Sequence, residues 1–427
     1  MEEVLKSSSM RILLVSQYFW PENFRINDLV RELVQRGHEV TVLTGLPNYP
    51  DGKFFSEFVR DPDRFACYEG AQVIRVPMLP RGQGGLRLLL NYLTFALSAS
   101  LVGLWRLRGR KFDIIFTYQL SPVTVGLPAA LMRFIKRAPM VFWVQDLWPE
   151  TLHAVGAVKS SFGMWAVSRL VAFIYKRCDL ILAQSRSFIP QIRKYAPSAS
   201  SVLFFPNWSD PAVDVVSVSP AREVPDRPGS FNVLFAGNIG EAQDFPAILA
   251  AAERLKLQQT RVRWLIVGDG RMACWVAEEV KRRRLDEQVL LLGRFPSERM
   301  PSFFKHADAL LVSLKDEPIF SMTIPSKLQT YLGSGVPVLA MLNGEGADVV
   351  SESGSGITCQ AGDHEALTSA VLKLFGMTIQ ERRAMGLKGL LVSESEFDRH
   401  KLITRLEGWF EKLRVHDKKS SINIKSL

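Results

Sequence analysis

The sequence predicts an α/β protein built from two doubly wound domains, and three observations carry this prediction. Short apolar runs alternate with helical patterns along the 427-residue chain. The alternation stops once, over residues 206–230, and then restarts. The chain is also long enough for two domains with separate cores. We therefore expect two parallel sheets, each covered by helices on both faces.

The apolar runs define the predicted strands. In the first half they are residues 12–19, 40–44, 73–76, 113–118, 140–144, 180–183 and 202–205. In the second half they are residues 233–236, 264–267, 289–292, 309–314, 336–341 and 356–359. The segment between the halves holds prolines, serines and acidic residues without a sustained period, which is typical of a linker. We expect domains at 10–210 and 231–395, and a C-terminal helix at 396–415 that packs back across the hinge.

Charge is distributed unevenly along the chain. The net charge is +10, and residues 1–210 carry 25 Lys and Arg against 16 Asp and Glu. A basic first half indicates an anionic partner, either nucleic acid or an anionic membrane surface. The four cysteines are far apart and form no CxxC pair. That spacing favours a reduced, cytoplasmic protein without a disulfide framework or a zinc site.

Residues 88–105 form an uncharged stretch between clusters of arginine. Their length is close to the roughly 20 residues of a membrane-spanning helix. Asn91, Thr94 and Ser98 fall on one helical face, however, which is typical of an amphipathic helix. The strands on either side should also join one sheet, which a spanning helix would prevent. We predict a crossover helix that lies either at a membrane interface or in the core.

The segment PSKLQTYLGSGVPVLA, residues 325–340, predicts a short helix followed by a buried strand. Ser326 and Gln329 have the spacing of a capping box, and the helix is expected to end near Gly333. Its start offers free N–H groups, a hydroxyl and the ammonium of Lys327, which together suit a phosphate or diphosphate. The alternative is an ordinary capped helix with a solvated lysine.

Three glycine-containing loops follow the first strands of the second half, beginning at Gly237, Gly268 and Gly293. The second loop matches the GxGxxA fingerprint of dinucleotide sites. The acidic residue that the fingerprint requires is missing, and Arg294 stands at the end of the next strand. A dinucleotide cofactor is therefore disfavoured. Because the loops and the helix start should meet at one sheet edge, they favour a nucleoside diphosphate site.

In the first half, the strand at 140–144 ends in polar side chains. Gln145, Asp146 and Glu150 follow it directly. Carboxylates at the end of a buried strand fit an active site, and they fit a capped loop as well.

Five segments together resemble the GT-B glycosyltransferases of family 4. They are RILLVSQYFWPENFRINDLVRELVQRGHEVTVLTGLPNYP, VQDLWPE, VLFAGNIGEAQDF, VGDGRM and PSKLQTYLGSGVPVLA. Within that family the chain is most similar to bacterial surface-polysaccharide transferases, in particular the N-acetyl-L-fucosamine transferases of O-antigen and capsule assembly. The resemblance implies two Rossmann-like domains facing across a cleft. It also implies retaining sugar transfer without an essential metal or other cofactor.

Residue by residue, the resemblance implies Asp146 and Lys327 as catalytic residues. The implied donor-binding residues are Gly237, Asn238, Gly240, Gln243, Gly268, Arg294, Phe295, Ser326, Lys327, Thr330 and Tyr331. The implied acceptor-binding residues are Glu22, Asn23, Arg25, Gln145 and Glu150.

Some positions depart from the family pattern. Gln145 stands where many members have histidine, and Asn238 and Gln243 stand where many have arginine and lysine. Met322 and Thr330 replace the usual pair of glutamates, so Thr330 would hold a donor ribose only weakly.

The implied reaction moves N-acetyl-L-fucosamine, or a related amino sugar, from a UDP-sugar to an undecaprenyl-diphosphate-linked sugar. The expected location is the cytoplasmic face of the plasma membrane, with the anionic membrane rather than nucleic acid as partner. The alternatives are a fucosyltransferase that uses GDP-fucose, a nucleotide-sugar 2-epimerase, and a non-enzymatic nucleotide-sugar-binding scaffold subunit.

Overall fold

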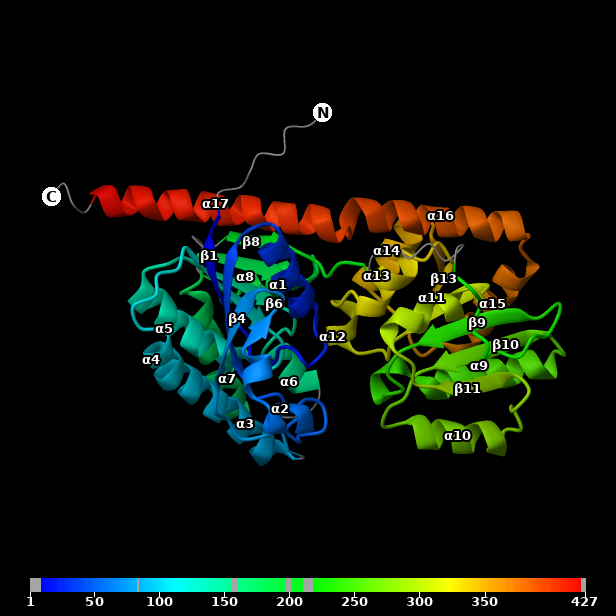
Figure 1. Cartoon of the computed structure of the whole chain (residues 1–427). Helices are drawn as coiled ribbons and strands as arrows, with labels where there is room; N and C mark the ends of the chain where they lie inside the picture. Colours follow the sequence, from blue (N-terminus) through cyan, green and yellow to red (C-terminus); the bar gives the residue numbers. More distant parts are fainter. Residues whose placement is uncertain (1–8, 83, 155–159, 197–200, 210–217, 424–427) are drawn as a thin grey trace. The chain divides into compact units, whose positions relative to one another are not determined.

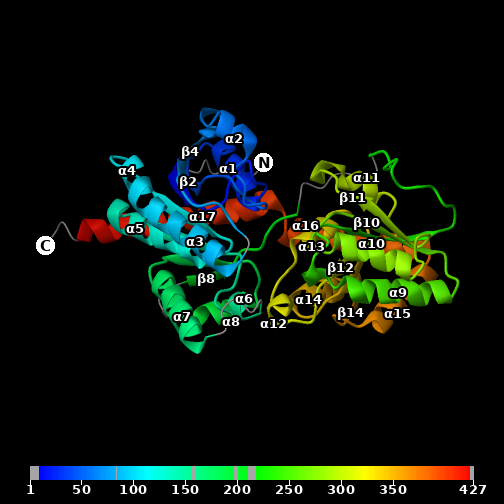
Figure 2. The same ribbon diagram turned by 90° about the horizontal axis from the view of Figure 1, so that it is seen from below.

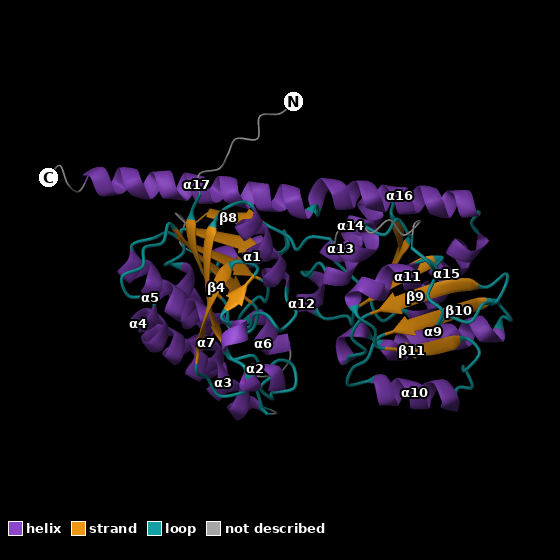
Figure 3. Ribbon diagram, viewed as in Figure 1, coloured by secondary structure: helices purple, strands orange, loops and turns teal. Residues whose placement is uncertain are grey.

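The computed structural model describes residues 9–82, 84–154, 160–196, 201–209 and 218–423, with only the backbone for 154 and 416–423. The chain forms two compact units (Figure 1). The first comprises Met1–Phe205 together with Ile403–Leu427, and the second comprises Pro206–Leu402. Each unit is a parallel sheet with helices on both faces (Figure 3), as the sequence predicts.

The first unit holds an eight-stranded sheet in the order β3-β4-β2-β1-β5-β6-β7-β8. Its strands are β1 (Arg11–Val15), β2 (Glu39–Gly45), β3 (Cys67–Tyr68), β4 (Ala71–Val76), β5 (Ile114–Gln119), β6 (Met140–Val144), β7 (Leu180–Ala183) and β8 (Ser201–Phe204). All neighbours are parallel except β3, which runs antiparallel to β4. The strand order reverses between β1 and β5, so the carboxyl ends of these strands are where such a fold binds ligands.

Figure 2 shows α3, α5 and α7 along one face of this sheet, with α17 behind it. The helices of the unit are α1 (Arg25–Gln35), α2 (Ser56–Arg60), α3 (Gly85–Ser98), α4 (Leu104–Arg106), α5 (Gly126–Lys136), α6 (Glu150–Ala154), α7 (Ser161–Tyr175), α8 (Phe188–Arg193) and α17 (Arg399–Asn423). A π-helical turn, η2 (Ala99–Gly103), joins α3 to α4, and 3-10 turns lie at η1 (Asp63–Phe65) and η3 (Val123–Val125).

The second unit holds a six-stranded, fully parallel sheet in the order β11-β10-β9-β12-β13-β14. Its strands are β9 (Phe231–Ala236), β10 (Val262–Val267), β11 (Val289–Gly293), β12 (Ala309–Ser313), β13 (Val338–Met341) and β14 (Gly356–Cys359). Every residue of the four central strands is buried, as expected for a parallel sheet covered on both faces. The strand order reverses between β9 and β12, which places the ligand-binding crevice at their carboxyl ends.

Two helical layers cover the second sheet. The helices are α9 (Phe245–Leu257), α10 (Ala273–Arg282), α11 (Met300–Phe304), α12 (Pro318–Ser321), α13 (Ser326–Leu332), α14 (Glu345–Ser353), α15 (His364–Gly376) and α16 (Ile379–Glu396), with 3-10 turns η4 (Glu241–Gln243) and η5 (Ser297–Arg299). Helix α9 packs beside α10 and α15, and α16 packs beside α13 and α14.

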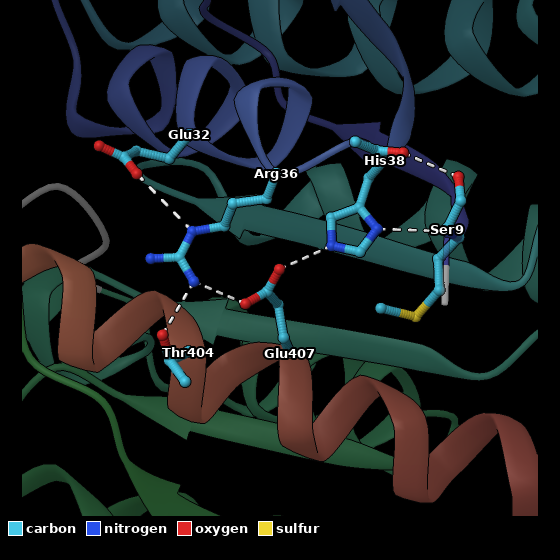
Figure 4. Close-up of polar contacts among 8 residues, drawn as sticks. Ser9, Glu32, Arg36, His38, Thr404 and Glu407 are labelled. Atoms are coloured by element: carbon cyan, nitrogen blue, oxygen red, sulfur yellow. Dashed lines mark hydrogen bonds and ion pairs between the residues drawn. The ribbon is translucent and has the colours of Figure 1, made fainter. Parts of the chain in front are cut away.

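The C-terminal helix α17 packs on the first unit from Ile403 onward. The Glu407 carboxylate lies 2.7 Å from His38 Nε2 and accepts a 2.7 Å bond from Arg36 (Figure 4). Phe410 meets Phe116 of β5 edge to face. The sequence stretch predicted as one helix from residue 396 is interrupted, since α16 ends at Glu396 and α17 begins at Arg399.

The uncharged stretch at 88–105 is helical throughout, formed by α3, η2 and α4. By length and composition alone, Gly85–Arg106 is apolar enough to cross a membrane, and 33% of its apolar window is buried. Asn91 is fully buried, whereas Leu97, Leu101 and Trp105 are exposed. The prediction of burial in the core is therefore wrong for the outer side of this helix.

Candidate active site

The loops after β9 and β10 interlock at the crevice of the second unit. The Gly237 amide donates to Val267 O at 2.8 Å, and the Ile239 amide donates to Asp269 O at 2.8 Å. Gly268 has φ +151°, and a Cβ built on it would lie 1.8 Å from Gly237 O. Glycine is therefore required at 268 because the backbone of the neighbouring loop fills the space of a side chain.

The side chains of Gln243 and Ser313 hold the loop after β9 through hydrogen bonds. Gln243 Oε1 accepts from the Gly240 amide at 3.2 Å, and Asn238 is exposed. A Cβ at Gly240 would lie 2.5 Å from Asn238 Nδ2, so glycine leaves room for the amide. Ser313, the last residue of β12, donates to Gln243 O at 2.7 Å. The end of β12 thus meets the loop after β9, at the reversal of strand order.

Lys327 lies beneath this loop. Its Nζ is 3.8 Å from the centre of the Phe235 ring. A Cβ at Gly237 would lie 3.2 Å from the same nitrogen. Within the described residues Lys327 Nζ has no hydrogen-bond partner. Burial lowers the pKa of Lys327 to about 7, so an anion bound near it would stabilise its charged form.

Tyr331 supports β9 rather than presenting a free hydroxyl. It accepts from the Ala236 amide at 2.8 Å and donates to Ala236 O at 3.1 Å. The side chain is buried, and burial raises its pKa. Tyr331 therefore fixes the strand end from which Gly237 continues.

The capping box predicted at the start of α13 is wrong. Pro325 is the N-cap residue, and no side chain caps the helix. Ser326 is exposed, while Gln329 is fully buried. Neither amide atom of Gln329 has a hydrogen-bond partner among the residues that the structure describes. Thr330 is half-buried on the turn after Ser326.

Arg294 and Phe295 lie farther out, after the edge strand β11. Arg294 is exposed. The Phe295 ring packs 4.7 Å from Phe303, and the Arg299 guanidinium stacks over it at 5.5 Å. The Gly268 amide joins this loop to the loop after β10, because it donates to Gly293 O at 2.8 Å.

In the first unit, Asp146 lies just beyond the carboxyl end of β6. The Asp146 carbonyl accepts from Gln119 Nε2 at 2.9 Å. Burial raises the pKa of the Asp146 carboxyl, although hydrogen bonds from Ser121 oppose this. Burial raises the pKa of the Tyr118 hydroxyl, and the charge of Arg25 opposes this. Gln119, Ser121 and Asp146 thus lie together at the carboxyl ends of β5 and β6.

Glu22 has a structural role in this unit. Its carboxylate accepts from the amides of Phe19 at 3.1 Å, Asn48 at 2.8 Å and Tyr49 at 2.7 Å. Burial raises the pKa of Glu22 to about 7. The carboxylate ties the loop after β1 to the loop after β2.

The remaining predicted acceptor residues differ in exposure. Asn23 is exposed. A guanidinium nitrogen of Arg25 lies 3.9 Å from a carboxylate oxygen of Asp28 in the first turn of α1. Gln145 is buried, and its carbonyl accepts from Gln184 Nε2 at 3.2 Å. Burial raises the pKa of the half-buried Glu150. Within the described part of the chain, no three His, Cys, Asp or Glu side chains gather as a metal ion would require.

Comparison with known proteins identifies the family. Residues 23–208 match the glycosyl transferase 4-like domain, and residues 230–376 match the glycosyl transferases group 1 domain. The chain belongs to the GT-B glycosyltransferases.

This glycosyltransferase is similar to two curated bacterial proteins. It is 26% identical to the probable glycosyltransferase WbjE of Pseudomonas aeruginosa over 62% of this chain and 66% of WbjE. It is 27% identical to the putative colanic acid biosynthesis glycosyl transferase WcaI of Escherichia coli K12 over 76% of this chain and 82% of WcaI. The match to WbjE thus spans just under two thirds of that relative's length.

Solved structures share the fold. Anabaena HepE in complex with UDP and glucose has a TM-score of 0.65 at 14% identity, covering 94% of this chain and 99% of HepE. WaaG, a glycosyltransferase involved in lipopolysaccharide biosynthesis, has a TM-score of 0.64 at 13% identity, covering 94% and 99%.

The sequence analysis of this glycosyltransferase missed several residues around Lys327 in the second unit and around Asp146 in the first unit. Phe235 lies under Lys327, Ser313 holds the loop after β9, and Ser121 bonds Asp146. In the sequence, Phe235 is typical of a core residue in a strand, and Ser313 is typical of a polar residue at a strand end. Ser121 stands in an ordinary serine-proline pair, so the sequence carries no distinguishing signal for it.

Proposed function

We propose that this chain transfers a sugar, with retention, from a UDP-sugar to a lipid-linked sugar in bacterial surface-polysaccharide assembly. The favoured sugar is N-acetyl-L-fucosamine or a related amino sugar, and the favoured acceptor is an undecaprenyl-diphosphate-linked sugar of O-antigen or capsule assembly. Support comes from the name of WcaI, which refers to colanic acid, and from HepE, which was crystallised with UDP.

The observation that carries the proposal is Lys327. A lysine whose ammonium is buried over a phenyl ring, without a hydrogen-bond partner in the described chain, is costly to keep charged. A diphosphate beside it would supply the missing partner. Because negative charge builds on the diphosphate as the sugar leaves, the same ammonium would stabilise the transition state.

The proposed step breaks the bond between the sugar's anomeric carbon and the diphosphate oxygen. A new bond forms from that carbon to the acceptor hydroxyl oxygen on the same face, which retains the configuration. The hydroxyl proton passes to a diphosphate oxygen. Asp146, with its raised pKa, is the candidate group for orienting the acceptor.

The experiment incubates purified protein with UDP-linked N-acetyl amino sugars and an undecaprenyl-diphosphate-linked N-acetyl sugar, and mass spectrometry follows the lipid product. We expect transfer with release of UDP. Epimerised nucleotide sugar without a lipid product would identify an epimerase instead. Donor binding without turnover with any acceptor or membrane fraction would identify a scaffold subunit.

The nucleotide is tested separately by thermal shift with UDP and with GDP. A ligand at about 100 times its Kd stabilises a protein by about 2.7 kcal/mol, which is measurable. A shift with GDP and none with UDP would replace the proposed donor with GDP-fucose.

We also propose that the transfer needs no metal and takes place at the inner face of the plasma membrane. Added EDTA should leave the transfer rate unchanged, and a loss that Mg²⁺ restores would contradict this. Cell fractionation should find the protein with membranes, and high salt should release much of it because basic residues near an anionic surface are screened.

A further inference from the structure

Helix α3 and its continuation through η2 and α4 turn an apolar stripe outward. The stripe residues are spaced three or four apart and are 40–72% exposed: Leu86, Leu90, Leu93, Leu97, Leu101 and Trp105. Single exposed leucines are common on soluble proteins. A continuous stripe along more than five helical turns is not, and it marks a surface that is covered by something apolar.

The π-helical turn keeps this stripe aligned. Bonds from residue i to i+5 widen the turn, so side chains four residues apart stay on one side more closely than in an α-helix. Leu97, Leu101 and Trp105 all remain outside, while Ala99 and Gly103 remain buried. A Cβ at Gly103 would lie 3.0 Å from the Leu43 side chain, so this inner side fits directly against β2.

The inner side of the helix is anchored by polar contacts. Asn91 Oδ1 accepts from Gln17 Nε2 at 2.8 Å, and Asn91 Nδ2 donates to Leu79 O at 2.6 Å. Phe95 beside it is completely buried. The helix is therefore anchored to the protein through Asn91 and Phe95 and carries exposed leucines on its outer side. Crossing a bilayer would require these contacts to break, so the helix is suited to lie on a membrane rather than span it.

Helices α5 and α7 extend the exposed surface. Helix α5 contacts both α3 and α7, on the same face of the sheet (Figure 2). Each carries large apolar side chains that are exposed: Phe134 and Ile135 on α5, and Phe162, Trp165 and Phe173 on α7. We call these residues, together with the stripe on α3–α4, the apolar face.

The helices of the apolar face carry cations and no acidic side chain, although Arg133 of α5 pairs with Asp179 at 2.7 Å. Segments 85–111, 126–137 and 161–177 hold eleven Lys and Arg and no Asp or Glu. Arg108 stacks 4.6 Å over Trp105, and Arg177 stacks 3.4 Å over Phe173. Helices α10 and α16 of the second unit, by contrast, carry charges of both signs. Aromatic rings paired with cations beside apolar surface suit the boundary between lipid headgroups and acyl chains.

We propose that the apolar face docks on an anionic lipid bilayer, with α3–α4 and the exposed ends of α5 and α7 lying in the interface. The leucines enter the acyl region, and the bordering arginines and lysines contact lipid phosphates. An acidic protein partner would match the charge but gives no reason for a stripe without hydrogen-bonding side chains. This inference assigns residues to the membrane position in the proposed function and rests on it.

The test is co-sedimentation of the full chain with vesicles of phosphatidylglycerol and phosphatidylcholine, or of phosphatidylcholine alone. The wild type should bind the anionic vesicles more tightly. The triple variant Leu93→Ser/Leu97→Ser/Leu101→Ser should lower the partition coefficient by at least about tenfold, because three apolar side chains leave the bilayer. The matched control is Leu387→Ser/Leu391→Ser on α16, whose leucines are 59% and 65% exposed. It should bind as the wild type does.

Two further measurements distinguish a loss of membrane binding from unfolding and from a loss of activity. Thermal unfolding should show that the triple variant folds, and transfer to a short-chain, water-soluble acceptor should persist because no stripe residue belongs to the site. Vesicle binding without transfer to any acceptor would sink the proposed function and leave the docking surface standing.

The docking surface would be overturned by any of three results. These are a triple variant that binds vesicles like the wild type, a wild type that ignores anionic vesicles, and a dimer in ultracentrifugation that the triple variant disrupts. Release from membranes by detergent alone would instead indicate a spanning helix.

Discussion

The Glu407 carboxylate lies 2.7 Å from the buried ring of His38, a residue 369 positions earlier in the chain. The same carboxylate accepts from Arg36, so one acidic side chain of α17 serves two basic residues at the end of α1. Burial opposes the charged form of Glu407, but hydrogen bonds from His38 and Arg36 more than offset it and lower its pKa. This contact secures α17 to the first unit.

Glu407→Gln should therefore destabilise the protein by about 1–3 kcal/mol at neutral pH, since His38 and Arg36 lose a charged acceptor. A carboxylate with a lowered pKa contributes stability above its unfolded pKa and loses it as pH falls through the folded value. The difference from wild type should thus shrink as pH falls below about 4.3, the ordinary pKa of glutamate. Thermal unfolding between pH 3 and 8 measures it. Glu411→Gln, one turn later, is the control and should cost little.

Lys327 should take up a proton when nucleotide binds. Its pKa is about 7 in the free protein, so at pH 8 it is mostly neutral. A bound diphosphate favours the charged form and raises this pKa. Calorimetry of UDP binding at pH 8, in buffers of different ionisation enthalpy, should show uptake of up to about one proton. Lys327→Met should show none.

Lys327→Ala should lower the transfer rate by about 10²–10³, the usual effect of removing one preorganised charge-stabilising group. A variant within a few-fold of the wild type would mean that the lysine is only a buried helix residue. Circular dichroism checks that the variant folds. Removing a buried ammonium should not lower Tm, so a loss of rate with an unchanged Tm separates chemistry from folding.

Gly268→Ala should destabilise the second unit by more than about 2 kcal/mol, because the new Cβ would lie 1.8 Å from Gly237 O. Gly293→Ala is the matched control. It also has a positive φ, +81°, but nothing lies within 4 Å of its Cβ. It should cost only about 1 kcal/mol of backbone strain. Equal losses of Tm would show that φ alone, and not the contact between the loops, requires glycine.

Asp146→Asn should raise stability and lower transfer at once. Burial raises the pKa of Asp146, so its contribution to stability is present at low pH and is lost as pH rises through the folded value. The neutral amide mimics the protonated form and should raise Tm by about 2 °C or more at pH 7. The gain should disappear at pH 3. A fall in Tm at pH 7 would show that the carboxylate is a structural bond acceptor.

Local pattern predicted the sheets well and the roles of polar residues poorly. Each predicted apolar run overlaps a strand, because burial on both faces leaves a continuous apolar signal. The two-residue β3, at Cys67–Tyr68, is too short to carry one. Lys327 was found through its place at a helix start, although that helix is not capped as predicted.

Long-range contacts explain the remaining differences. The resemblance implies that Glu22 binds the acceptor, yet its carboxylate accepts hydrogen bonds from the amides of Asn48 and Tyr49 in another loop. Asn91 lies on the polar face that the sequence indicates, but its side chain points into the protein because it hydrogen-bonds to Gln17 and to the carbonyl of Leu79. The spacing of residues along a helix does not show which side faces the protein, because that side is set by contacts with residues far along the chain.

The packing of α17 has a consequence for synthesis on the ribosome. All eight strands of the first sheet precede residue 206, but Phe410 and Glu407, which cover Phe116 and His38, are translated about 200 residues later. During synthesis, part of the first sheet therefore stays uncovered until the second unit and then α17 have been translated. A gene fragment that ends at residue 205 would leave that surface uncovered, and α17 supplied as a separate peptide would be expected to cover it again.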